Sequence, residues 1–464
     1  MLEIAIGISL ALLGYVCVVK LPLHAYSSLP AQRPPRRDCW ENWRKLQPEE
    51  QRELSPGPQA GKFAYIMSRF PKITETFILY EILEHQRRGD TVEIYPLMRE
   101  RQAVTHPDAA RAVERAHFLP FLSPAILRAN WYYLRRRPGA YWKVMKEVLR
   151  GTFGNTNYFM GALVFFPKSV AFAYDMEHRG LTHVHAHYAT HPALSALIIH
   201  RLTGIPFSFT AHAHDVHRDR RMLGQKLAAA KFAVSISEHN RDLMTGESRQ
   251  HLRDKIRIIH CGADTSYFRP SSAPAPPGPL NILCVASLLE MKGHADLIRA
   301  CHLLRQRGIA FHCDFIGDGK LKEALVEQVA RAGLQNAISF LGPQSRAVVL
   351  TRLQQSHVKV LACTSARDGV RDGIPVALME AMACGLPVVS TVLSGVPELV
   401  EDGISGILVK PRDPAALANA LERLARDPGL RARLGAAGRE RVLRDFDLAA
   451  NAQTLAALFA GAVA

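Results

Sequence analysis

The stretch DGIPVALMEAMACGLP, residues 372–387, decides the fold class of this 464-residue chain. Gly373 and Pro375 suit a loop that enters a helix, because proline is tolerated in the first helical turn. Gly385 and Pro387 suit the turn that ends the helix. The stretch therefore predicts a short helix between two loops, the kind of segment that joins parallel strands in an α/β domain.

Glu380 lies inside this helix on an apolar face. A carboxylate in such surroundings is costly unless a partner satisfies it. The two hydroxyls of a ribose are suitable partners, because an ionised carboxylate accepts both of their hydrogen bonds. A structural salt bridge to a neighbouring element is the alternative explanation. The residues three and four positions away are Val376, Ala377, Ala383 and Cys384.

Asp372 comes just before the helix, whose first turn presents backbone N–H groups that suit a diphosphate or sugar oxygens. Glu380 lies about five residues further into the helix, or ~7–8 Å along its axis. This spacing suits one acid near a sugar and the other near a ribose.

Apolar runs of strand length alternate with helical segments on both sides of this stretch. The first run, 63–67, precedes a segment in which apolar residues recur at helical spacing from Ile78 to Leu83. Such alternation indicates doubly wound α/β domains. Further strand-like runs lie at 92–95, 183–187, 206–210, 232–236, 256–260, 281–285, 315–316, 338–341, 358–362, 387–390 and 406–409.

The Pro-rich segment SSAPAPPGPL, residues 271–280, is the predicted domain boundary. It separates an N-terminal Rossmann-like domain, 61–270, from a C-terminal one, 281–430, which is followed by helices over 431–464. A chain of this length suits two large domains. None of the eight cysteines forms a C-x-x-C pair, and most lie in apolar runs, which indicates reduced thiols.

Residues 1–23 form a candidate membrane anchor. The run from Ile4 to Val19 carries no charge, and Lys20 and Arg33 follow it. The positive-inside rule then leaves the body of the protein in the cytoplasm. An interfacial helix, or a segment that never inserts, is the alternative. Residues 24–60 are polar and rich in Pro and Arg, and are predicted to be a linker.

The segment 121–174 differs from the rest, because it mixes aromatic and basic residues. Seven Lys/Arg and one acid lie between Arg128 and Arg150, beside tryptophans and tyrosines. With a net charge of +16, the chain favours polyanionic partners, and this insert suits a membrane surface. The alternative is a helical hairpin whose aromatics pack on the domain. No nucleic-acid motif accompanies the patch, so no nucleic-acid partner is expected.

The frame G-x-P-x-x-x-x-E-A-M-A-x-G-x-P resembles the retaining glycosyltransferases of family 4. That family has the GT-B fold: α/β, with two Rossmann-like domains whose parallel sheets face an interdomain cleft. The segment SRFPKITETF, 68–77, resembles the exopolysaccharide branch, including colanic-acid-type enzymes. Further matching stretches are TAHAHD (210–215), VASLLEMKGH (285–294), FIGDG (315–319) and DGISGIL (402–408), so the resemblance spans roughly residues 62 to 445.

The resemblance implies roles for individual residues. Lys292 would contact the donor diphosphate, Glu380 the ribose, and His212 a hydroxyl of the donor sugar. Asp372 would be the first acid of the pair. Backbone amides of the loop and helix start would face the sugar and phosphates, and a loop after the first strand would border donor phosphate and acceptor. The loop and helix-start residues are Gly373, Ile374, Pro375 and Val376; those of the first-strand loop are Lys72, Thr74 and Glu75.

Two positions depart from the family pattern. Ser287 stands where the family has an arginine, five residues before the lysine, so one phosphate cation is missing unless Arg367 or Arg371 replaces it. Asp372 stands where the family has glutamate, one methylene longer. These departures leave open a non-catalytic scaffold that binds nucleotide sugars.

The resemblance implies a metal-independent, retaining transfer of a hexose from a UDP- or GDP-sugar to a glycan or polyprenyl-linked acceptor, at the cytoplasmic face of the inner membrane and without a cofactor. A nucleotide-sugar epimerase of the same fold is one alternative. A metal-dependent hydrolase is another, because alternate residues of a strand share one face and imidazoles bind zinc or iron. Its ligands would come from the histidine cluster between 183 and 217, which includes His183, His185, His187, His212, His214 and His217.

Overall fold

The computed structural model describes residues 61–70, 76–100, 112–113, 116–218, 220–272, 277–367 and 369–461. The chain divides into two compact units. The first comprises Met1–Phe209 and Arg221–Lys231, and the second comprises Thr210–Arg220 and Phe232–Ala464.

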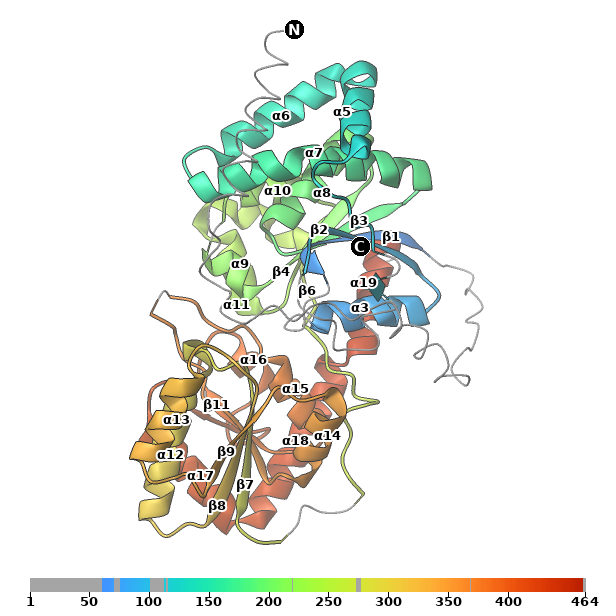
Figure 1. Cartoon of the computed structure of the whole chain (residues 1–464). Coiled ribbons are helices and arrows are strands. Elements are labelled where there is room, and N and C mark those ends of the chain that lie inside the picture. Colours follow the sequence, from blue (N-terminus) through green and yellow to red (C-terminus); the bar gives the residue numbers. More distant parts are fainter. Residues whose placement is uncertain are drawn as a thin grey trace, which may run out of the picture. The chain divides into compact units, whose positions relative to one another are not determined.

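The first half of the chain builds a six-stranded parallel sheet, in the order β2-β1-β3-β4-β5-β6 (Figure 1). Its central strand β3 is buried along its whole length, as expected for a parallel sheet covered on both faces. The strands lie where the apolar runs predict them. They are β1 (Lys62–Phe70), β2 (Thr91–Arg99), β3 (His183–His187), β4 (Phe207–Ala211), β5 (Phe232–Ser235) and β6 (Ile256–Ile258).

The segment 121–174 is helical. Ser123 caps α5 and Asn155 caps α7 through their side chains, which accept from backbone amides of the first turn. Pro138 begins α6, as suits a first helical position. The helices of this half are α3 (Thr76–Arg87), α5 (Pro124–Arg136), α6 (Pro138–Thr152), α7 (Thr156–Arg179), α8 (His191–Thr203), α9 (Ala213–Arg218), α10 (Leu223–Ala229) and α11 (Glu238–Thr245).

A second six-stranded parallel sheet follows, in the order β12-β11-β10-β7-β8-β9. The first strand, β7, therefore lies between β8 and β10, and the direction of winding reverses there. In doubly wound sheets, ligands bind beyond the carboxyl ends of the strands at this switch point. The strands are β7 (Leu280–Val285), β8 (Phe311–Ile316), β9 (Ile338–Gly342), β10 (Val358–Leu361), β11 (Val388–Thr391) and β12 (Ile407–Val409).

Helices flank this second sheet (Figure 1). Each buries one apolar face: on α17, Leu417, Leu421 and Leu424 recur at helical spacing and are buried. The predicted helix of residues 372–387 is α15, which begins at Val376. These helices are α12 (His294–Gln306), α13 (Lys322–Arg331), α14 (Arg346–Gln355), α15 (Val376–Ala383), α16 (Val396–Leu399), α17 (Pro414–Arg426) and α18 (Pro428–Asp445). The last helix, α19 (Leu448–Ala460), instead packs Phe459 against Phe232 of β5.

Within the described residues, no helix has the length and apolar character that crossing a membrane requires. The predicted anchor, 1–23, and linker, 24–60, lie outside these residues. The six described cysteines are free thiols.

Candidate functional site

Lys292 lies in the loop after β7, at the switch point of the second sheet. It ends the short helix η3 (Glu290–Lys292), and Gly293 then turns the chain into α12 with φ near +69°. The amide of Thr364, beyond β10, donates to the Met291 carbonyl oxygen over 2.9 Å. The loops after β7 and β10 are thereby joined, and Lys292 is held at their junction.

Gly293 is required at this junction by both its backbone angle and its surroundings. A Cβ there would lie 1.7 Å from the Ala362 carbonyl oxygen. We expect Gly293→Ala to lower the melting temperature clearly. Gly308 is the control position, because its φ is similar, +71°, and a Cβ there would have no neighbour within 4 Å. Gly308→Ala therefore introduces only the backbone strain, about 1–2 kcal/mol. Equal melting temperatures of the two variants in thermal unfolding would contradict this packing.

Asp372 forms an ion pair with Lys292, whose Nζ donates to the Asp372 Oδ2 atom. Burial alone would lower the pKa of Lys292, but the Asp372 carboxylate more than offsets this, so the pKa is raised. Lys292 is therefore charged. The side chains of Lys292 and Asp372 are 17% and 22% exposed, so a ligand can still reach both.

Glu380 lies in the middle of α15 and is half-buried. Burial raises its pKa to about 7, and the charges of Arg346 and Lys359 offset part of the shift. Among the described residues no hydrogen bond or ion pair to its carboxylate is found. The structural salt bridge considered as the alternative explanation is therefore not seen, and an unpaired carboxylate in poorly solvated surroundings suits a polar ligand.

Lys359 is a cation that the sequence analysis missed. It lies fully buried on β10, and its Nζ donates to the Val285 carbonyl oxygen over 3.2 Å. Burial lowers its pKa to about 8, so the amine is still mostly protonated at neutral pH. The available signal was a lysine inside the apolar run 358–362, which is unusual because lysines are rarely fully buried.

His294, the first residue of α12, is also buried beside these charges. Burial, helped by Lys359 and Lys292, lowers its pKa to about 4, so the ring is neutral. Neither ring nitrogen has a hydrogen-bond partner in the described part of the chain. The ring therefore lies at the switch point without adding charge.

The loop before α15 is closely packed. Pro375 caps the helix in extended conformation, and the amides of Val376 and Ala377 donate to no described residue, as at any uncapped helix start. A Cβ on Gly373 would lie 3.2 Å from the Ala213 Cβ atom. The helix start thus retains donors for an anion.

His212 lies between β4 and α9, at the carboxyl end of its strand, and is buried. Its neighbour Ala213 is the residue that approaches Gly373, and both belong to the second unit. The segment that carries His212 is therefore adjacent to the loop of Asp372. Lys72, Thr74 and Glu75 lie outside the described residues.

The two arginines considered as replacements for the missing cation are at the surface. Arg367 is 94% exposed, and its Nε lies 3.7 Å from the Glu290 Oε1 atom. Arg371 is exposed, and Ser287 is half-buried. Lys292 is consequently the one cation that the described residues place in contact with Asp372.

Two of the candidate metal ligands, His185 and His187, converge in the first unit with Glu81, a residue that the sequence analysis did not name. One ligand atom each of Glu81, His185 and His187 lie within 4.8 Å of one another. All three have hydrogen-bond partners: His187 Nε2 is 3.2 Å from the Glu81 Oε1 atom, which also accepts from Tyr65, and His185 Nδ1 is 2.8 Å from the Ser208 Oγ atom.

Two imidazoles and one carboxylate are suitable ligands for zinc or iron. The hydrogen bonds of these three side chains also satisfy them without an ion. His183 and His212 are not in this group, and the side chains of His214 and His217 lie outside the described residues. Burial lowers the pKa of His183 to about 3, so its ring is neutral.

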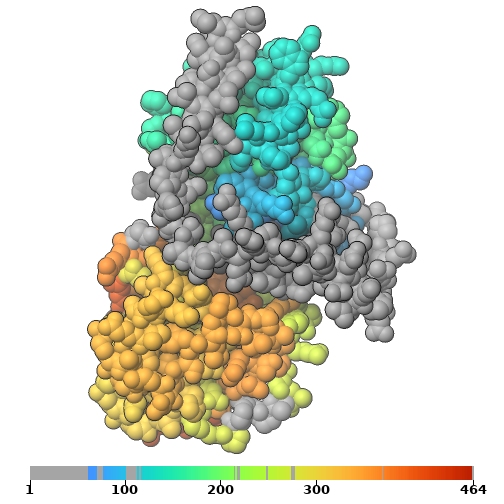
Figure 2. Space-filling view, viewed as in Figure 1, coloured from blue at the N-terminus to red at the C-terminus, as the bar shows by residue number. Residues whose placement is uncertain are grey.

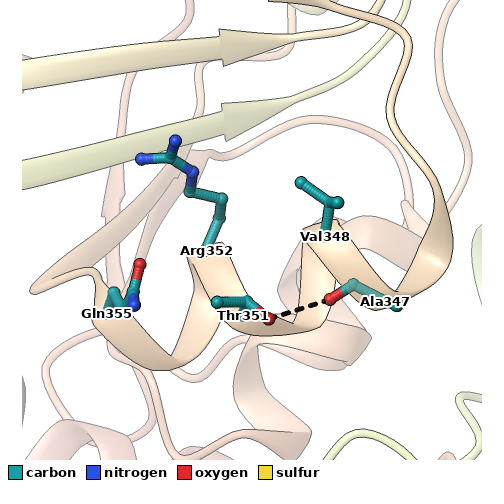
Figure 3. Close-up of a pocket in the computed structure, with 5 residues that line it drawn as sticks. All are labelled: Ala347, Val348, Thr351, Arg352 and Gln355. Atoms are coloured by element: carbon teal, nitrogen blue, oxygen red, sulfur yellow. Dashed lines mark hydrogen bonds between the residues drawn. The ribbon is translucent and has the colours of Figure 1, made fainter.

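A pocket on the outer side of α14 lies elsewhere in the second unit (Figure 3). Thr351 donates to the Ala347 carbonyl oxygen within it, and its one charged residue, Arg352, pairs with Asp314. These contacts are local, and we assign the pocket no role. Its lining residues are Ala347, Val348, Thr351, Arg352 and Gln355.

Solved structures share this architecture. A glycosyltransferase from Rickettsia africae aligns with 87% of this chain and 99% of its own, with a TM-score of 0.66 and 16% identity. Anabaena HepE in complex with UDP aligns with 86% of this chain and 100% of its own, with a TM-score of 0.64 and 15% identity. The chain thus has the two-domain α/β fold of the GT-B class.

The family model described as Glycosyl transferases group 1 matches residues 269–441 of the chain. WcaL of Salmonella typhimurium, named as a colanic acid biosynthesis glycosyltransferase, is 39% identical over 44% of this chain and 51% of its own. The amylovoran biosynthesis glycosyltransferase AmsK of Erwinia amylovora is 40% identical over 37% of this chain and 42% of its own. The chain therefore spans about half the length of these curated relatives.

Proposed function

We propose that this protein is a retaining glycosyltransferase that transfers a hexose from a nucleoside diphosphate sugar to a glycan or polyprenyl-linked acceptor in exopolysaccharide biosynthesis. The observation that carries the proposal is the placement of Lys292, Asp372 and Glu380 around the switch point of the second sheet. The names of WcaL and AmsK support the polysaccharide assignment, and the UDP bound to HepE supports a nucleotide donor.

Each of the three side chains has a chemical task in this proposal. Glu380, which has no partner among the residues that the structure describes, accepts hydrogen bonds from the ribose hydroxyls. Lys292 has three N–H donors, so it can keep Asp372 while it contacts the diphosphate. Asp372, held next to the phosphates, accepts from a hydroxyl of the sugar. The positive end of α15 adds donors for the phosphates or sugar oxygens.

The chemical step then needs little from the protein beyond positioning and charge. The bond between the anomeric carbon and the phosphate oxygen breaks, and Lys292 stabilises the departing diphosphate. The acceptor oxygen bonds to the same carbon from the face that the diphosphate leaves, which retains the anomeric configuration. The acceptor proton passes to the departing phosphate oxygen. In this proposal His212 contacts the sugar, and no metal or cofactor takes part.

The same proposal assigns the residues that border the acceptor and the location of the enzyme in the cell. Lys72, Thr74 and Glu75 would border the acceptor, and a polyprenyl-linked acceptor would place the enzyme at the cytoplasmic face of the inner membrane. Residues 1–23 would serve as its anchor.

A panel of UDP-, GDP- and ADP-sugars tests the donor assignment on the purified full chain. We expect one nucleotide class to raise the melting temperature by several degrees, because a ligand that binds only the folded state stabilises it. With an acceptor glycan, NMR of the product should show the anomeric configuration of the donor. Activity should survive EDTA treatment.

Other outcomes of the panel would overturn the assignment. Interconversion of two sugars on the nucleotide without an acceptor would identify an epimerase. Loss of activity on chelation, with stoichiometric zinc or iron in the untreated protein, would favour the hydrolase built on Glu81, His185 and His187. Donor binding without transfer to any acceptor glycan would indicate a scaffold.

A further inference from the structure

We propose that the solvent-facing sides of α5 and α6 form a docking surface for an anionic lipid bilayer. Figure 1 shows these two helices as the outer layer over α7. In Figure 2 their residues, coloured teal, reach the molecular surface. The binding concerns a surface outside the donor site, so it does not depend on the proposed function.

Large apolar side chains are concentrated on this surface. Of the ten exposed large hydrophobic residues in the described part of the chain, five lie between 122 and 153. On α5, Leu127 and Trp131 are one helical turn apart and are 72% and 57% exposed. Such clustering marks an interaction site rather than scattered surface residues. The five residues are Leu127, Trp131 and Trp142 on the two helices, with Leu122 just before α5 and Phe153 just after α6.

Cations surround these apolar residues. The only acid of the two helices is Glu147, and its carboxylate is already paired with Arg201 over 3.2 Å. Arg135 lies over the Trp131 ring at 5.6 Å, within cation–π range. No described acid pairs with any of the exposed cations of this surface, which are Arg128, Arg135, Arg136, Lys143, Lys146 and Arg150.

The inner face of the helix pair, rather than the exposed side chains, packs on the rest of the domain. Tyr133 is buried and its hydroxyl donates to the Glu177 carboxylate over 2.8 Å. Tyr141 is buried and donates to the Asn130 amide oxygen over 2.9 Å. The tyrosines thus pack on the domain, as the hairpin alternative predicts, whereas Trp131 and Trp142 point outward from the same helices.

The chemistry of the surface favours a bilayer over single-stranded nucleic acid. Both ligands attract cations and aromatic rings. Aliphatic side chains such as Leu122 and Leu127 add nothing to base stacking, but they are stabilised in the acyl boundary beneath the headgroups. Tryptophan and arginine prefer the headgroup level of a membrane. The combination therefore selects anionic lipid.

The four tryptophans of the chain allow a local test. Trp40 and Trp43 lie outside the described residues, so a full-length Trp40→Phe/Trp43→Phe protein reports only from Trp131 and Trp142. With vesicles of brominated phosphatidylcholine and phosphatidylglycerol, we expect a blue-shifted and quenched tryptophan emission. Vesicles of brominated phosphatidylcholine alone should quench far less. This signal comes from the surface itself, whatever residues 1–23 do.

Charge reversal tests the cationic contribution. In the same background, Arg128→Glu/Lys143→Glu/Lys146→Glu should weaken binding to the anionic vesicles by a hundredfold or more, since each cation near such a membrane contributes about fivefold. A control with Lys320→Glu/Lys322→Glu, which are exposed in the second unit, should leave binding nearly unchanged.

Three results would each overturn the proposal. These are absence of quenching by anionic vesicles, equal quenching by neutral vesicles, and equal weakening by the control substitutions. If a single-stranded oligonucleotide shifts the tryptophan emission while vesicles do not, the surface binds nucleic acid instead.

Discussion

Glu380→Ala is expected to abolish detectable transfer and to weaken binding of the nucleoside diphosphate by a hundredfold or more. Two hydrogen bonds from ribose hydroxyls to a carboxylate contribute about 3 kcal/mol or more, because each charge-assisted bond contributes about 1.5–3 kcal/mol. The measurement is isothermal calorimetry with the nucleotide, together with the initial rate of transfer. The control is Glu323→Ala, which removes an exposed carboxylate from α13 and should change neither quantity.

Stability distinguishes a ligand-binding role from a structural one. Because burial raises the pKa of Glu380 to about 7, its ionised form is disfavoured in the folded protein. The native protein therefore loses stability as the pH rises from the unfolded-state pKa of about 4.3 to about 7, by at most about 4 kcal/mol.

Glu380→Gln removes this titration. We expect the variant to melt higher than the native protein at about pH 8, and the difference to shrink near pH 4. A variant that melts lower at both pH values would show that Glu380 holds the fold together.

Lys292→Ala is expected to reduce kcat/KM by about a hundredfold to a thousandfold, the loss typical of removing one preorganised donor to a charge that develops in the transition state. The loss should depend on the phosphates. Binding of UDP should weaken strongly, and binding of uridine should hardly change. Lys292→Arg should recover part of the activity, because the positive charge remains.

Lys292→Ala also leaves Asp372 without its ion-pair partner, which is a structural reason for lost activity. A double substitution separates this effect from the loss of phosphate binding. If Lys292 served only to neutralise Asp372, the double variant Lys292→Ala/Asp372→Asn would regain UDP affinity relative to Lys292→Ala. We expect no such recovery. The surface substitution Lys322→Ala is the matched control for the lost lysine.

Most of the fold could be predicted from the sequence, because each strand is encoded locally. The strand-like run of residues 183–187 coincides with β3, and the apolar run 281–285 matches β7 to within one residue. The helix between Pro375 and Gly385 could be predicted from the residues at its two ends. The three helices of 121–179 have no strand pattern, and the packing of α5 on α7 depends on contacts such as that of Tyr133 with Glu177, 44 residues apart.

The site was less accessible to sequence reasoning, because its geometry depends on contacts between distant segments. Lys292 and Asp372 pair across 80 residues, and only the order β10-β7-β8 brings their loops together. Lys359 is a notable cation because its side chain is fully buried on β10, which the sequence alone does not show. The convergence of Glu81 and His187 likewise joins α3 to β3 across 106 residues.

The central claim is that Glu380 binds the ribose of the donor, and a ligand–protein cycle tests it most directly. The affinities of UDP and 2′,3′-dideoxy-UDP are measured by calorimetry for the native chain and for Glu380→Gln. Removal of the two hydroxyls should cost the native chain a hundredfold or more in affinity and should cost the variant much less. An equal loss in both proteins would contradict the assignment of Glu380 to the ribose.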